Sequence, residues 1–449
     1  MNNNYDIAII GSGPGGFAGA IRAVELGLKV CLIEKDLIGG TCLNWGCIPT
    51  KAIVRSIDLL REIKHSHEFG VDIQGCSFDM SNILKRKDDL VSKIRAGAQA
   101  LLKSKNIDII NSKGQLSDAN TIKTDKGLII AKNIIIATGS LPAESGTLKI
   151  DHDTLYSSKD MLSLEKLPKS LAIIGGGFIG CEFASIFNEL GVEVTIIELM
   201  DQLLPNFDKE IARRLELSFK KRDIKILKGE KVMSVKSEVL TTITLESGNS
   251  MDAEKAFLCI GRRPNVMGIN LEGVGVELKN NVIITNKDFR TNIPNIYAIG
   301  DVRGNYFLAH VAAYEGKKVV EIISGSKPEI DYSAVPSAIF THPEIASVGI
   351  SEDIARAKGI ETITTKFPFA AVSKANVLGQ TDGFIKLVTE VKTKAILGAF
   401  IFGPSASELI SNFTIAIRNS LTANDISDTI FAHPTLSESI LDIADRVKA

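Results

Sequence analysis

Two segments of this 449-residue chain repeat one pattern of strand, glycine turn, helix, strand and acid. Residues 7–34 and 171–198 match at a constant offset of 164. Each copy begins with a short apolar run, passes through a glycine-rich turn into a helical pattern, and closes its second apolar run on Glu34 or Glu198. Strands that alternate with helices in this way build parallel sheets. The repeat therefore predicts two βαβ units in an α/β fold.

The glycine turns have the spacing of the dinucleotide-binding fingerprint. Its first glycine makes the tight turn, its second lets a pyrophosphate approach the backbone, and its third packs the helix on the strand, while the distal acid holds a ribose hydroxyl. One such motif would be weak, but two copies with strand, helix and acid in register favour two dinucleotide sites over two structural turns. The glycines are Gly11, Gly13 and Gly16 in the first copy and Gly175, Gly177 and Gly180 in the second.

Glu198 also discriminates between nucleotides. Its carboxylate would repel the 2′-phosphate of NADP(H), and no arginine follows within residues 199–202. The second site is therefore expected to prefer NAD(H).

Cys42 and Cys47 lie just downstream of the first glycine turn. On an ideal α-helix this spacing puts their Cα atoms roughly 8.7 Å apart, beyond the ~7 Å limit for a disulfide. The pair can bridge only if the helix is distorted, for which Gly46 and Pro49 supply the means. Spacing alone leaves open a redox-active pair and two buried, unpaired cysteines. For a bridging pair we expect helix around the cysteines with a distortion near Asn44–Gly46.

Composition narrows the class of protein. A prior of about 150 residues per domain suggests three domains. The net charge of −1 gives no general field for nucleic acid or an acidic membrane, and the basic runs at 85–87 and 220–222 are predicted to be solvated helix faces. No stretch is long enough for a transmembrane helix. The strand-like residues 5–10 leave no room for a signal peptide, so a cytoplasmic location is expected.

Six cysteines do not make a structural disulfide framework in a chain of this length. No metal site is predicted. The cysteines outside the close pair are predicted to be small core residues: Cys31, Cys76, Cys181 and Cys259.

Six motifs are spread over nearly the whole chain. They are Gly-Ser-Gly-Pro-Gly-Gly at 11–16, the cysteine segment at 39–51, Ala-Thr-Gly-Ser at 137–140, Gly-Gly-Gly-Phe-Ile-Gly at 175–180, Tyr-Ala-Ile-Gly-Asp at 297–301 and Ala-His-Pro-Thr-Leu-Ser-Glu at 432–438. In this order they resemble the flavin-dependent pyridine nucleotide–disulfide oxidoreductases. The likeness is greatest to the branch of that family that oxidises protein-bound dihydrolipoamide with NAD⁺.

The resemblance implies the arrangement of the whole chain. It implies two Rossmann-like dinucleotide-binding domains, for FAD and for NAD, and a C-terminal α+β interface domain that forms a homodimer. The implied boundaries are 1–142 and 263–330 for the FAD-binding domain, 143–262 for the NAD-binding domain and 331–449 for the interface domain.

The resemblance also implies cofactor contacts. Glu34 would bind the FAD ribose, and the cation of Lys51 would stabilise negative charge on the flavin. The implied FAD contacts are Gly11, Gly13, Gly16, Glu34, Lys51, Gly114, Thr138, Gly139, Asp301 and Ala309. The implied NAD contacts are Gly175, Gly177, Ile179, Gly180, Glu182, Glu198, Val232 and Gly261.

His433 and Glu438 match the acid–base pair of the family, in which the carboxylate orients the imidazole. Imidazole suits this task because its unperturbed pKa of about 6.5 lies near working pH. The resemblance implies that His433 of the partner subunit accepts the substrate proton. It further implies that Cys42 exchanges disulfides with the dithiol and that Cys47 faces the flavin.

The implied function is the oxidation of protein-bound dihydrolipoamide to lipoamide, within 2-oxo acid dehydrogenase or glycine cleavage complexes. A lipoyl-bearing protein or an acyltransferase core is then the expected partner. Reductases of the glutathione or mercuric type are the alternative. Most of them use NADPH, which Glu198 disfavours. Mercuric reductases would also end in two adjacent cysteines, which residues 445–449 lack. A non-catalytic flavoprotein scaffold is a third reading, disfavoured because both cysteines, Lys51 and His433 are present.

Overall fold

The computed structural model describes residues 4–448, and the chain divides into two compact units. Unit 1 comprises Met1–Leu167 and Phe257–Ile330, and unit 2 comprises Pro168–Ala256 and Asp331–Ala449. Each unit is thus assembled from two separate stretches of chain. The finer boundaries at residues 142, 262 and 330 stay predictions.

Unit 1 combines one large sheet with helices. Its strands are β1 (Asn4–Ile10), β2 (Val30–Glu34), β3 (Asp108–Asn111), β4 (Gln115–Leu116), β5 (Thr121–Thr124), β6 (Gly127–Ile136), β7 (Ser140–Pro142), β8 (Leu155–Tyr156), β16 (Arg262–Pro264), β17 (Leu278–Lys279), β18 (Val282–Ile283) and β19 (Ile296–Ala298). Its helices are α1 (Pro14–Glu25), α2 (Gly40–Trp45), α3 (Cys47–Lys64), α4 (Met80–Ser104), α5 (Ser158–Met161) and α8 (Ala309–Ile323), with 3₁₀ turns η1 (Ser66–Phe69), η2 (Glu272–Val274) and η3 (Gly300–Arg303).

The sheet of unit 1 has the order β3-β2-β1-β6-β5-β4, and β19 also pairs with β6. Strand β1 runs parallel to both β2 and β6. Because side chains alternate along a strand, Ile7 and Ile9 enter one apolar cluster and Ala8 and Ile10 enter another. Both faces of β1 are therefore buried, as expected for a central strand of an α/β sheet.

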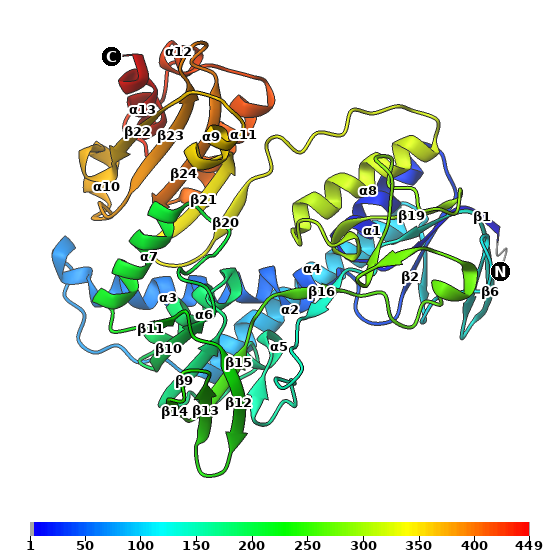
Figure 1. The fold of residues 1–449 in the computed structure, drawn as a ribbon, viewed down its shortest axis with the longest axis horizontal. Coiled ribbons are helices and arrows are strands. Elements are labelled where there is room, and N and C mark those ends of the chain that lie inside the picture. Colours follow the sequence, from blue (N-terminus) through cyan, green and yellow to red (C-terminus); the bar gives the residue numbers. More distant parts are fainter. Residues whose placement is uncertain (1–3, 449) are drawn as a thin grey trace. The chain divides into compact units, whose positions relative to one another are not determined.

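Helices α1 and α8 pack against each other over one face of this sheet (Figure 1). Glycines make the close approach possible. A Cβ built on Gly316 of α8 would lie 2.2 Å from the carbonyl oxygen of Gly15, and one on Gly19 would lie 3.1 Å from that of Gly316. The first two turns of α1, at Gly15 and Gly19, are thus held in place by a helix that begins almost 300 residues later in the chain.

Unit 2 joins the second copy of the repeat to the C-terminal domain. Its strands are β9 (Ser170–Ile174), β10 (Glu193–Glu198), β11 (Lys225–Lys228), β12 (Val232–Ser237), β13 (Thr241–Leu245), β14 (Ser250–Ala253), β20 (Ser337–Ile339), β21 (Glu344–Gly349), β22 (Thr362–Pro368), β23 (Phe384–Glu390) and β24 (Ile396–Gly403), and β15 (Lys255–Leu258) crosses the boundary at residue 257. Its helices are α6 (Phe178–Glu189), α7 (Lys209–Lys221), α9 (Glu352–Ala357), α10 (Ser373–Val377), α11 (Ala406–Arg418), α12 (Ala423–Ser427) and α13 (Glu438–Lys448), with η4 (Phe369–Ala371).

The two copies of the repeat match in three dimensions as they do in sequence. Strands β9, β10 and β11 are parallel, like β1, β2 and β3. In the first turn Gly11 N donates a hydrogen bond to Ile33 O at 2.8 Å. In the second turn Gly175 N donates to Ile197 O, also at 2.8 Å. Helices α1 and α6 begin and end at positions that differ by 164. The predicted α/β fold with two Rossmann-like units is confirmed.

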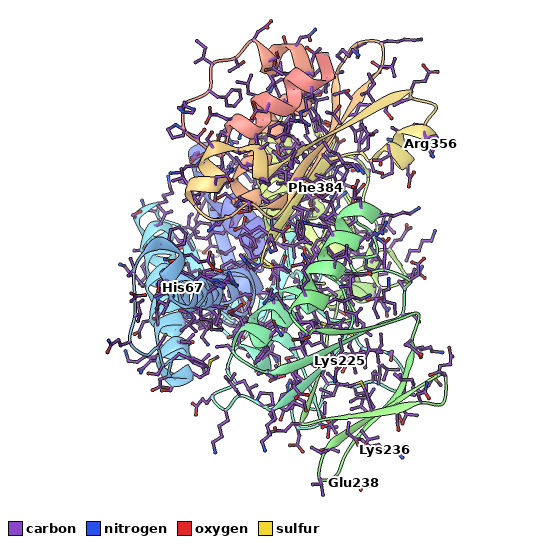
Figure 2. All side chains as sticks on the ribbon, turned by 90° about the vertical axis from the view of Figure 1, so that its left-hand side faces the viewer. His67, Lys225, Lys236, Glu238, Arg356 and Phe384 are labelled. Carbon is purple, nitrogen blue, oxygen red and sulfur yellow. The ribbon has the colours of Figure 1, made fainter. Side chains whose placement is uncertain are left out.

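The C-terminal part of unit 2 is a five-stranded antiparallel sheet in the order β20-β21-β24-β23-β22. On β23, which begins at Phe384 (labelled in Figure 2), Ile385 and Leu387 enter an apolar cluster with residues of α11 and α13. Lys386 points to the other face and is 1% exposed, where its ammonium contacts Asp208 and Glu352, both at 2.7 Å. An α+β domain therefore follows the second nucleotide fold, as predicted.

Three residues contradict their predicted environments. Within the predicted solvated run at 85–87, Lys87 is buried and donates to Leu162 O at 2.7 Å. Within the run at 220–222, Arg222 is half-buried and donates to Ser185 O at 3.0 Å and His342 O at 3.1 Å. Cys76, predicted to be a core residue, is exposed, whereas Cys31 and Cys181 are buried as predicted. Lys87 and Arg222 are removed from solvent because each donates to backbone carbonyl groups that are distant in sequence. Such partners cannot be predicted from the neighbouring residues.

In the part of the chain that the structure describes, no helix has both the length and the apolar character needed to cross a bilayer. Residues 4–448 also contain no group of three or more His, Cys, Asp and Glu side chains arranged to hold a metal ion.

Replacing Gly316 by Ala should destabilise unit 1. The added methyl would meet the Gly15 carbonyl at 2.2 Å, so α8 must shift from α1 at a cost of about 1–3 kcal/mol. Thermal unfolding of the holoprotein measures the effect. Gly97→Ala is the matched control, because Gly97 lies inside α4 with open space around its Cα, and it should raise stability by up to ~1 kcal/mol. Equal effects of the two variants would contradict the proposed close packing.

Candidate functional site

The first glycine turn leads into the N-terminus of α1. A Cβ on Gly16 would lie 1.9 Å from Gly11 O, so this position packs the helix against the turn. A Cβ on Gly13 would meet nothing within 4 Å. Gly13 precedes Pro14 at the start of α1 without any side-chain cap. Uncapped N–H groups and open space at a helix N-terminus fit a pyrophosphate.

Glu34 closes this turn from the end of β2. One carboxylate oxygen accepts from the backbone N and the Oγ of Ser12, at 2.9 and 2.7 Å, and the other accepts from Asp36 N at 2.9 Å. Glu34 is only 8% exposed. An ionised carboxylate has about four acceptor positions, so these three bonds leave capacity for a ribose hydroxyl.

The structure gathers all ten predicted FAD contacts within unit 1. Thr138 and Gly139 follow β6, and Thr138 Oγ1 donates to Asn265 O at 2.7 Å. Asp301 lies in η3, and Ala309 is the first residue of α8. Gly114, which lies between β3 and β4, has close neighbours in the sheet, with a built Cβ 3.2 Å from Ile33. The roles of these residues stay predictions.

A series of hydrogen bonds that was not predicted from the sequence supports Asp301. Ser140 Oγ donates to Asp301 Oδ2 at 2.5 Å, and Arg262 donates from Nε to Ser140 Oγ and from Nη2 to Ser140 O, both at 2.8 Å. Burial lowers the pKa of Arg262, whereas Asp301 and Cys47 favour its charged form. The only sequence signal was that Ser140 and Arg262 directly adjoin the predicted contacts Gly139 and Gly261.

The cysteines lie on two helices, not one. Helix α2 ends at Trp45, Gly46 has φ −138° and ψ −109°, and α3 begins at Cys47. The predicted distortion within residues 44–46 is confirmed, and it lies at Gly46. As a result the side chains of Cys42 and Cys47 are in hydrogen-bond contact, which the ideal helix would not allow.

The break gives the two thiols different environments. The hydrogen bond to Cys47 and then burial raise the pKa of Cys42, and the charge of Lys51 lowers it only partly. Cys47 is the first residue of the 18-residue helix α3. The positive end of a helix dipole stabilises a thiolate there. The raised pKa of Cys42 favours its protonated form, whereas the N-terminus of α3 favours a thiolate at Cys47.

The second glycine turn repeats the first in unit 2. Gly176 N donates to Glu198 Oε2 at 2.6 Å and Met200 N donates to Oε1 at 2.8 Å. A Cβ on Gly177 would meet nothing within 4 Å, which again fits a pyrophosphate. Glu182, on α6, is buried and accepts from Phe340 N at 2.9 Å. Val232 begins β12, whereas Gly261 belongs to unit 1.

His433 and Glu438 form the predicted pair. His433 Nδ1 lies 2.8 Å from Glu438 Oε1, and Thr435 N donates to Glu438 Oε2 at 2.8 Å. The bond from Thr435 and then the bond to His433 hold the pKa of Glu438 below its usual value. Glu438 therefore stays ionised at neutral pH and fixes the imidazole. The His433 side chain is 70% exposed and is therefore accessible to a substrate or a second subunit.

Comparisons with known proteins agree with this geometry. Residues 5–316 match the family model described as pyridine nucleotide-disulphide oxidoreductase, and residues 335–444 match the dimerisation domain of the same family. The dihydrolipoyl dehydrogenase of Chlamydia muridarum is 43% identical over 447 residues, which cover 98% of this chain and 96% of that protein.

Solved structures give the same result. LpdA from Mycobacterium tuberculosis has a TM-score of 0.93 and 29% identity, with 99% of each chain covered. The HOCl-induced flavoprotein disulfide reductase RclA from Escherichia coli has a TM-score of 0.89 and 28% identity, with 98% of this chain and 99% of that chain covered. The family match over most of the chain, together with 43% identity over nearly its full length, shows that this chain belongs to the pyridine nucleotide-disulphide oxidoreductases, in the branch of the dihydrolipoyl dehydrogenases.

Proposed function

We propose that this protein oxidises protein-bound dihydrolipoamide to lipoamide through Cys42 and Cys47, with FAD and NAD⁺ as cofactors. The observation that carries the proposal is the helix break at Gly46, which brings the two thiols into contact and starts α3 at Cys47. Membership of the dihydrolipoyl dehydrogenase branch supports the choice of substrate.

The reaction begins with the Cys42–Cys47 pair as a disulfide. His433 of the partner subunit accepts a proton from one thiol of the substrate, and the resulting thiolate attacks the sulfur of Cys42. An S–S bond forms to Cys42 while the bond to Cys47 breaks, and Cys47 leaves as a thiolate. The second substrate thiol then attacks the mixed disulfide, closes the substrate disulfide and releases Cys42, which takes up the proton of that thiol. Two electrons have passed from the substrate to the cysteine pair.

The geometry supports this division of roles between the two cysteines. Cys47 is the better leaving group, because the N-terminus of α3 stabilises its thiolate. Cys42, whose pKa is raised, holds its proton once released. Bound FAD and NAD⁺ supply the two-electron chemistry that restores the disulfide. The open glycine turns at Gly13 and Gly177, with the closing acids Glu34 and Glu198, support binding of the two dinucleotides.

The proposed assembly is a homodimer that acts on a lipoyl-bearing protein or an acyltransferase core of a 2-oxo acid dehydrogenase or glycine cleavage complex. The match of residues 335–444 to a dimerisation domain supports the homodimer. The cytoplasm is the proposed location, since a cysteine pair that cycles between thiol and disulfide suits a reducing compartment.

A disulfide reductase is the second candidate function, favoured by the likeness to RclA. It would run the same thiol chemistry in the opposite direction, from reduced nucleotide to disulfide substrate. Glu198 supports NAD(H) over NADP(H) in either direction, because its carboxylate would repel a 2′-phosphate.

Anaerobic titration of the purified holoprotein separates the two functions. Dihydrolipoamide should reduce the protein and produce a long-wavelength absorbance band from a thiolate beside the flavin. NAD⁺, but not NADP⁺, should then reoxidise the protein. Reoxidation by NADP⁺ alone, or failure of dihydrolipoamide to reduce the protein, would contradict the proposed function.

Cys47→Ser should abolish dihydrolipoamide oxidation, because no disulfide can form to receive the electrons. Cys76→Ser is the matched control, since Cys76 is an exposed cysteine outside the pair, and it should keep full activity. Steady-state NADH production measures both. Full dithiol turnover in Cys47→Ser would exclude the disulfide route.

His433→Gln should lower kcat for dihydrolipoamide about 10²–10⁴-fold, the usual contribution of a positioned acid–base group. NADH oxidation by an artificial electron acceptor, which needs no substrate thiolate, should change little. His152→Gln is the control, because His152 is also exposed and pairs with a carboxylate, Asp160, at 2.9 Å. If His433→Gln loses no more than His152→Gln, the proton is accepted elsewhere.

A further inference from the structure

The helix that carries Cys42 has little stability of its own. Helix α2 has six residues, and no side chain caps its N-terminus. It lies between two permissive glycines: Gly39 has φ 100°, and Gly46 interrupts the path to α3. Isolated helices of this length do not persist in water. Its position must therefore be fixed by contacts with the rest of unit 1.

One buried side chain of α2 makes several of these contacts. Asn44 is 8% exposed. Its Nδ2 donates to Gly40 O at 2.9 Å, at the start of α2, and to Ile38 O at 3.0 Å, in the preceding loop. Its Oδ1 accepts from Nη1 of Arg95 on α4 at 2.9 Å. Asn44 thus connects both ends of α2 to α4, which is far away in sequence. The residue of α4 that makes this contact is Arg95, which lies outside the cysteine motif.

Packing alone does not hold this side of α2. A cavity of about 440 Å³ borders Asn44 and Trp45, and Arg95, Lys87 and Lys159 also line it. The Lys159 ammonium lies 4.6 Å from the centre of the Trp45 ring. Packing does not hold the side of α2 that faces this cavity, so the polar contacts of Asn44 supply the constraint on that side.

We propose that Arg95 is a positioning residue for the redox pair, which holds α2 through Asn44 so that Cys42 stays within reach of Cys47. The inference rests on the proposed function of the pair. Reduction breaks the S–S bond, and only a fixed α2 keeps the released thiols in contact. A loosened α2 gains conformational freedom in the dithiol state, which lowers the effective concentration of one thiol for the other. Loss of Arg95 should therefore favour the dithiol over the disulfide.

Arg95→Met tests this, with Arg86→Met as the matched control. Arg86 also lies on α4 and donates from Nη1 at 2.9 Å, but to Ala52 O of α3. Holoprotein is equilibrated in buffers of oxidised and reduced dithiothreitol, quenched with an alkylating agent, and counted for free thiols by mass spectrometry. Arg95→Met should shift the equilibrium about tenfold towards the dithiol, or about +30 mV for this two-electron couple. Arg86→Met should match the unmodified protein, and Arg95→Lys, which keeps a donor, should fall between.

A second measurement uses Trp45, the only tryptophan in the chain. Quenching of its fluorescence by acrylamide should be about twofold faster in Arg95→Met than in Arg86→Met, because α2 is released. An equal potential and equal quenching in these two variants would overturn the role of Arg95. If Arg95→Met does not fold, Arg95→Lys carries the test, and a potential equal to that of the unmodified protein would overturn it. Neither readout uses lipoamide or NAD⁺, so failure of the proposed substrate leaves this test intact.

Discussion

A single carboxylate supports both the first nucleotide turn and the redox helix. Glu34 accepts two bonds from Ser12, and charge-assisted bonds of this kind are roughly twice as strong as neutral ones. Ser12 in turn accepts from Gly39 N, through its carbonyl at 3.1 Å and its hydroxyl at 3.2 Å. Gly39 immediately precedes α2. The start of the helix that bears Cys42 is therefore hydrogen-bonded to the same turn that is shaped for a pyrophosphate.

The second copy of the repeat differs from the first at the position of Ser12. Glu198 closes it as Glu34 closes the first, but Gly176 stands where the first copy has Ser12. A Cβ on Gly176 would lie 2.5 Å from Leu203 Cδ2, so a serine at this position would require the Leu203 side chain to shift. The chain after β10 is tied down by Leu204 N, which donates to Gly176 O at 2.8 Å. The residue after the first glycine thus contacts the residue before α2 in the first copy, where it is Ser12, and the loop at Leu204 in the second copy, where it is Gly176.

Local and periodic features were predictable from the sequence, whereas features made by distant partners were not. Each copy of the repeat, its closing acid and the break between the cysteines involve residues within about 30 positions of one another, so they could be predicted. Lys87, Arg222 and Lys386 are held by residues between 34 and 178 positions away, and cations in sequence look alike whether solvated or buried. Arg95 likewise meets Asn44 only because α4 folds back along α2. Ser140 and Arg262, 122 positions apart, meet for the same reason.

The asymmetry between the two sulfurs originates in the backbone. An unbroken helix would have placed both cysteines mid-helix, too far apart to bond and with similar surroundings. The break at Gly46 makes Cys47 the first residue of a long helix and leaves Cys42 on a short one. A helix N-terminus favours negative charge on the sulfur of Cys47, and the charge of Arg262 acts there as well. One glycine therefore brings the two thiols into contact and gives them different surroundings, which supports the proposed role of Cys47 as the leaving thiolate.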